Sequence, residues 1–135
     1  MENQTATSVI SARSQKRCAQ VFNFGSVIAV LLMPLFPVLL IWIGLSIFVY
    51  SANIHHPNPL VRQYTQHAGY RFYGIFGGLL ASMIFAGVLI PLVGDGLHLG
   101  LVLWAIAFAV VVPAGLFALL KAHKECWRDM SIETQ

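Results

Sequence analysis

Charged residues are scarce in this chain, and long stretches of it have none. Lysine, arginine, aspartate and glutamate together make up 10% of the 135 residues, whereas 58% are hydrophobic. An ordinary soluble domain carries about 25% charged residues. No charged residue occurs over residues 18–61, 72–94 or 96–120. A soluble fold of this size would lack the polar surface needed to cover so much apolar chain. The composition therefore excludes a soluble domain and predicts an integral membrane protein.

Cysteine is rare, and the common catalytic motifs are missing. The two cysteines, Cys18 and Cys126, have neither C-x-x-C nor metal-ligand spacing, so redox chemistry and a zinc site are not indicated. No set of nucleophile, base and orienting group can be assembled from the sequence, and there is no phosphate-binding loop. We therefore expect a protein that is not an enzyme and that carries no cofactor.

Three apolar segments are long enough to cross a bilayer, whose hydrocarbon core needs about 20 helical residues. They are residues 22–50, 72–93 and 97–120. Backbone groups in lipid must be satisfied internally, and strand-like alternation is absent, so an all-α membrane fold is predicted. The predicted organisation is a polar, flexible, basic N-terminal segment (residues 1–20), a helical membrane domain (21–125) and a short C-terminal tail (126–135).

The first apolar segment is longer than one span requires and carries Pro34 and Pro37 near its middle. Each proline removes a helical hydrogen-bond donor and clashes with the preceding turn, so a hinge is predicted there. Each half would form a helix about 20 Å long, which is too short to cross separately but suits a re-entrant hairpin. The alternative is one long, tilted and kinked helix that crosses the bilayer.

The basic residues help to choose between these two topologies. If the first segment spans, three Lys and Arg lie on one side of the membrane and five on the other. If it turns back, all eight lie on one side, as the positive-inside rule favours. We therefore favour the hairpin, with a cytoplasmic N-terminus. The residues expected at the lipid headgroups are Arg13, Lys16, Arg17, Arg62, Arg71, Lys121, Lys124, Trp127 and Arg128. The N-terminal basic cluster has no aromatic platform, so nucleic-acid binding is not expected.

The second and third segments are predicted to form an antiparallel transmembrane hairpin with its turn at residues 93–96. Small residues recur every four positions along the second segment, at Gly74, Gly78, Ser82 and Ala86. Small residues allow helices to approach closely in lipid, where packing drives association. This helix-packing face is expected to contact either the third segment or another protein.

Residues 51–74, between the first two apolar segments, are rich in histidine, tyrosine and arginine. Asn58 suits a helix N-cap and Pro59 a first helical position, so a helix is predicted to begin there and to enter the second segment. One face of this helix is predicted to carry Leu60, Tyr64, His67 and Arg71. An aromatic belt at the membrane surface is expected from Tyr64, Tyr70, Phe72 and Tyr73.

The histidines of this stretch are the alternative ligands for a metal or haem. His55 and His56 are adjacent, which is poor geometry for one ion, and His67 lies eleven positions beyond His56. No carboxylate occurs in the stretch to complete a site. We therefore expect no metal site, and keep these three residues as the candidates should metal binding be found.

Two parts of the sequence resemble small bacterial membrane proteins of unknown function that are related to the chloroplast inner-envelope import-channel component. They are "PVLLIWIGL" from Pro37 and "NPLVRQYTQHAGYRF" from Asn58. The residues that correspond to the family's polar link are Pro59, Val61, Arg62, Gln66, His67 and Ala68, with histidine and glutamine in the opposite order. The resemblance implies a compact helical domain in a bacterial inner membrane, without known catalytic residues.

The function expected from these features is that of a small accessory, scaffold or assembly subunit in a larger membrane complex. Its expected partners are membrane lipids and other integral membrane proteins, in a hetero- or homo-oligomer. One alternative is an oligomeric transport or pore-forming module. A second alternative is a metal- or haem-binding membrane subunit that uses the histidine-rich stretch.

Overall fold

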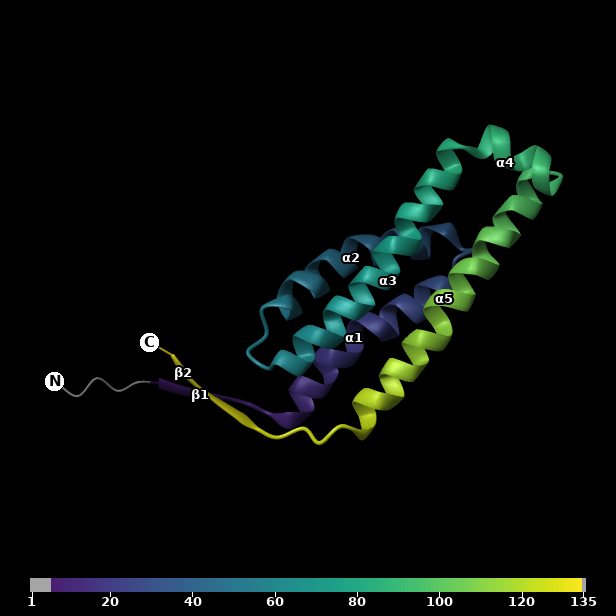
Figure 1. Cartoon of the computed structure of the whole chain (residues 1–135). Coiled ribbons are helices and arrows are strands. Elements are labelled where there is room, and N and C mark those ends of the chain that lie inside the picture. Colours follow the sequence, from purple (N-terminus) through teal and green to yellow (C-terminus); the bar gives the residue numbers. More distant parts are fainter. Residues whose placement is uncertain (1–5, 135) are drawn as a thin grey trace.

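The computed structural model of the chain describes residues 6–134, which form five helices and a small two-stranded sheet (Figure 1). The elements are β1 (Ala6–Ile10), α1 (Ala12–Leu31), α2 (Phe36–Ile54), α3 (Pro59–Ile84), α4 (Ala86–Val93), α5 (Gly96–Lys124) and β2 (Met130–Thr134). α2 and α5 are each long and apolar enough to cross a membrane, and α3 with α4 is a third candidate if the bent pair is one span. The predicted all-α membrane fold is confirmed.

The first apolar segment is broken at its prolines, as predicted. α1 ends at Leu31 and α2 begins at Phe36, with Pro37 in its first turn, where the missing N–H costs no helical hydrogen bond. α1 and α2 pack together as an antiparallel hairpin, so the start of α1 and the end of α2 lie at the same end of the molecule (Figure 1).

The predicted lengths of the two hairpin helices were wrong. α1 has 20 residues and α2 has 19, which makes each about 30 Å long. Both helices continue through polar residues beyond the apolar run, since Ser11 caps α1 and α2 extends to Ile54. α2 therefore reaches the length of a span by itself.

α1 is the central helix of the bundle and packs against α2, α3 and α5. Its buried face mixes apolar residues with the polar side chains of Gln15, Asn23 and Ser26. Protein surrounds these polar groups, so they can bond to neighbouring helices, which lipid would not allow. This explains how a helix with a polar half can occupy the centre of a membrane fold.

Phe22 of α1 is fully buried at the centre of an aromatic cluster. The centroid of its ring lies 5.8 Å from those of Trp42 and Tyr73 and 6.1 Å from those of Tyr50 and Phe72, all in edge-to-face geometry. Edge-to-face contacts are a favoured arrangement of aromatic rings. This cluster joins α1 to both α2 and α3.

The predicted aromatic belt was wrong for three of its four members. Phe72 and Tyr73 belong to the cluster around Phe22, and Tyr64 is buried against Trp127. Tyr70 alone of the four is exposed, at 66%. Phe72 and Tyr73 lie on the side of α3 that packs against Phe22 of α1, whereas Tyr70 does not.

The second apolar segment is two helices, which corrects the prediction of one continuous span. α3 ends at Ile84 and α4 begins at Ala86, and their axes differ by 88°. The bend is not at a proline, because Pro91 lies inside α4. The predicted turn before α5 is confirmed: Gly94 has a φ of 109°, and the Asp95 carboxylate accepts a hydrogen bond from the His98 N–H at 2.8 Å.

The two ends of the described chain pair as an antiparallel ribbon, in which Ala6 lies opposite Thr134 and Ile10 opposite Met130. The N-terminal segment, predicted to be flexible, therefore contains a strand over Ala6–Ile10 and the first turns of α1. Residues 1–5 of that prediction lie outside the described residues. β1 and β2 sit at the same end of the bundle as the link between α2 and α3 (Figure 1).

Candidate functional site

All eight lysines and arginines belong to segments at one end of the molecule. These segments are the first turns of α1, the first half of α3, the end of α5 and the tail before β2 (Figure 1). The opposite end consists of α4 and the turn that carries Asp95. The fold thus gathers all its lysines and arginines at one end, as the hairpin prediction required, together with Glu125, Asp129 and Glu133.

Gln15 ties three segments together at this basic end. Its side chain is fully buried, and its Nε2 donates to the backbone oxygens of Ile10 at 3.1 Å and Arg128 at 2.8 Å. Its Oε1 accepts from Asn58 Nδ2 at 2.7 Å. Next to it, the Ala12 N–H donates to the Asp129 carboxylate at 2.7 Å. We call this group the polar junction; it holds the N-terminal strand, the tail and the α2–α3 link in one place.

The α2–α3 link is ordered by its own polar groups. Asn58 is the N-cap of α3, as predicted, because its Oδ1 accepts from the Leu60 N–H at 2.9 Å. The Asn58 N–H in turn donates to His56 Nδ1 at 3.0 Å, and Arg62 donates to the His56 carbonyl oxygen at 3.2 Å. Burial, and then the nearby Arg62 charge, lower the pKa of His56 below its ordinary 6.5, which keeps Nδ1 free to accept at neutral pH.

The three candidate metal ligands are not brought together. His55 is exposed at the end of α2, and His56 is buried in the link. His67 is exposed on α3, on the side that faces α5. Within residues 6–134, no three His, Cys, Asp or Glu side chains are close enough to hold a metal ion. The stretch acts in this structure as a connector between helices.

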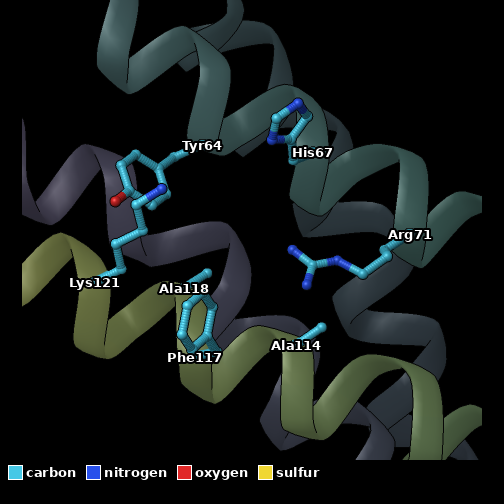
Figure 2. A pocket seen from close by; sticks show the side chains of 7 residues that line it. All are labelled: Tyr64, His67, Arg71, Ala114, Phe117, Ala118 and Lys121. Carbon is cyan, nitrogen blue, oxygen red and sulfur yellow. The ribbon is translucent and has the colours of Figure 1, made fainter.

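A groove of about 240 Å³ runs between α3 and α5 at the basic end (Figure 2). Tyr64, His67 and Arg71 face it from α3, on the side of the helix predicted from their spacing. Lys121 and Phe117 face it from α5, and α1 lies beneath (Figure 2). The remaining lining residues are Ala114 and Ala118. We call it the basic groove.

In the described part of the chain, the cations of the basic groove form no salt bridge with a carboxylate. Arg71 Nη2 donates to Asn23 Oδ1 at 3.3 Å, which is a neutral acceptor on α1. Among the described residues, the one pair within salt-bridge distance is His98 with Asp95, at the other end of the molecule. Glu125 lies at the outer end of the groove, where its carboxylate accepts from the Tyr64 hydroxyl at 3.3 Å. Within residues 6–134, the groove therefore presents Arg71 and Lys121 as positive charges without a salt bridge.

Sequence spacing found one wall of this groove but not the other. The α3 stripe follows directly from the helical period, whereas Lys121 and Phe117 lie some fifty residues further along the chain. They meet the stripe because α1 holds α5 beside α3. Close packing of α5 on α1 is visible at Gly115, where an added Cβ would lie 2.6 Å from the Val27 side chain.

No described residue covers the glycines of the small-residue face of α3. A Cβ added at Gly74, Gly77 or Gly78 would meet no atom within 4 Å. Ala81 and Ser82 continue the same exposed side, and Gly77 and Ala81 widen the predicted stripe into two rows. Ala86 does not belong to it, since the 88° bend places that residue on α4. The small-residue face is hereafter Gly74, Gly77, Gly78, Ala81 and Ser82. The predicted contact with α5 is not made at its three glycines, and the predicted contact with another protein stays a prediction.

Comparisons with protein-family models, with curated proteins and with solved structures found no match to this chain.

Proposed function

We propose that this protein is a non-catalytic accessory or assembly subunit of a larger membrane complex. The observation that carries the proposal is the open small-residue face, which suits a transmembrane helix of a partner protein as its occupant. Bulky side chains cover most lipid-facing helix surfaces, whereas exposed glycines permit a second helix to approach backbone to backbone. α3 presents three glycines to the outside, and none of the helices that the structure describes lies against them.

The polar groups inside the bundle favour a packing role over transport. The Ser46 hydroxyl bonds to the Tyr73 hydroxyl at 3.0 Å and to the Ile43 carbonyl oxygen at 2.8 Å. Trp42 Nε1 donates to the Ser26 hydroxyl at 3.2 Å. These side chains satisfy one another within the fold, as buried polar groups in a membrane must. A transport pathway would require polar groups that face a passage.

Gly78→Leu is expected to weaken partner association by about tenfold, since overpacking a close contact costs about 1–3 kcal/mol. The measurement is site-specific photo-crosslinking at Ala81 in intact membranes, with the adduct identified by mass. Wild type should give a discrete adduct with another membrane protein, and Gly78→Leu should remove most of it.

Gly44→Leu is the matched control, because Gly44 is also an exposed helical glycine with open space around it but lies on α2. It should leave the adduct unchanged. An adduct only with a second copy of this chain, or equal effects of the two substitutions, would contradict the accessory proposal.

We further propose that the protein lies in a bacterial inner membrane with its basic end in the cytoplasm, as the positive-inside rule favours. Cys18 and Cys126 are both free and both belong to the basic end. A membrane-impermeant thiol reagent should therefore reach both from the cytoplasmic side only. Leu97→Cys, at a residue 72% exposed near the opposite end, should react from the outside. Labelling of Cys18 and Cys126 from opposite sides would overturn this topology.

A further inference from the structure

We propose that the basic groove between α3 and α5 binds a phosphate group, and that its source is the headgroup of an anionic phospholipid. This inference is independent of the accessory role, because it uses the groove and not the small-residue face. The groove has three properties that suit such a site: donors from two helices, two cations without a salt bridge among residues 6–134, and an apolar wall.

The donors of the groove come from two helices. Arg71 and His67 lie one helical turn apart on α3, and Lys121 lines the same groove from α5, with its amine next to the Tyr64 ring (Figure 2). Arg71 uses one nitrogen on Asn23, at 3.3 Å, which leaves the rest of its guanidinium for a second acceptor. Asn23 is buried, with 3% of its surface exposed, so the bond anchors Arg71 to α1. An arginine held in this way is suited to bind phosphate oxygens in a bidentate manner.

The groove carries positive charge that a bound anion would neutralise. Arg71 and Lys121 have no carboxylate within 4.0 Å among the described residues. A cation near the hydrocarbon region is costly unless it pairs or reaches a headgroup. Glu125, the acidic residue at the groove's outer end, is held by the Tyr64 hydroxyl at 3.3 Å. A phosphate placed between Arg71 and Lys121 would supply the missing counter-charge.

The position of the groove favours a lipid over a soluble anion. Arg71 and Lys121 each stand at the boundary of an uncharged run, at residues 72–94 and 96–120. The groove therefore lies where the apolar part of the fold begins. Phe117, 70% exposed, and Ala114 extend the wall from the cations into that apolar part. A phospholipid meets both halves of this surface, since its phosphate reaches the cations and its glycerol and chains follow the apolar wall.

The test is native mass spectrometry of the purified full-length protein in detergent with defined lipids. Wild type is expected to retain phosphatidylglycerol several-fold more than phosphatidylcholine. Arg71→Gln/Lys121→Gln should reduce retention of phosphatidylglycerol to the level of phosphatidylcholine. Arg13→Gln/Arg17→Gln is the control, because it removes the same net charge from exposed residues outside the groove. It should lower retention of phosphatidylglycerol much less than the groove variant does, because Arg13 and Arg17 are expected to meet headgroups without lining the groove.

Two further measurements keep the outcome unambiguous. Lys121→Gln alone changes an exposed side chain and should fold normally while lowering retention about half as far on a logarithmic scale. Inorganic phosphate is added in a parallel arm. If wild type retains the two lipids equally while phosphate raises the unfolding temperature of wild type but not of the double variant, the groove binds phosphate and the lipid source is wrong. Equal retention of the two lipids without a phosphate effect, or equal losses in the groove and control variants, would overturn the proposal.

Discussion

Phe22→Ala is expected to lower the free energy of unfolding by about 3 kcal/mol, the largest effect of any single substitution considered for this protein. The ring is fully buried and contacts four other aromatic rings from two neighbouring helices. Its removal leaves a cavity where α1 meets both α2 and α3. In lipid the loss is mainly one of packing, which places the expected value at the lower end of the range for buried phenylalanine. Equilibrium unfolding in mixed micelles, followed by circular dichroism, measures it.

Phe24→Ala is the matched control, because Phe24 lies two residues away on the same helix and is 57% exposed. Its loss is expected to change the free energy of unfolding by less than about 0.5 kcal/mol. Similar losses for the two variants would show that the aromatic cluster around Phe22 does not hold the hairpin to α3.

Gln15→Leu is expected to lower the free energy of unfolding by about 2–3 kcal/mol. Leucine has nearly the same size but leaves Asn58 Nδ2 and the carbonyl oxygens of Ile10 and Arg128 without their partner. Each unsatisfied group in a buried setting costs about 1 kcal/mol or more. Hydrogen exchange should show faster opening of β1, β2 and the α2–α3 link, while the centre of the bundle is unchanged.

Gln20→Leu provides the comparison on the same helix. Its Nε2 makes a single interhelical hydrogen bond, to the Leu119 carbonyl oxygen at 3.1 Å. The expected loss is about 1 kcal/mol, without a specific effect on the strands. If Gln15→Leu costs no more than Gln20→Leu, the polar junction does not act as a unit.

Several features of the fold were predictable because their causes are local. The uncharged runs require a membrane fold, Pro34 and Pro37 break the first segment, and Asn58 caps the helix that begins at the next residue. The α3 side of the basic groove also followed, because residues 64, 67 and 71 share a face at the helical period. Each of these depends on neighbours within about one or two turns of helix.

Other features were not predictable, because they depend on which surfaces meet. Gln15 looked like part of a flexible polar segment, yet it is buried by the tail and the α2–α3 link. Phe72 looked like part of an interfacial belt, yet it packs on Phe22 of α1. The bend between α3 and α4 lies at Phe85, where there is no proline, and no local sequence pattern predicted it.

The sequence by itself determined that this is a helical membrane protein with its basic residues gathered in a few segments. Only the tertiary structure decided that α1 lies at the centre, with its polar side chains enclosed by three other helices. The physical reason is that hydropathy reports the cost of exposing a residue to lipid, whereas burial against protein removes that cost. The same packing brings Lys121 and Arg71 to one groove and leaves the glycines of the small-residue face without a neighbour in the described structure, and these two surfaces carry the proposals made for this protein.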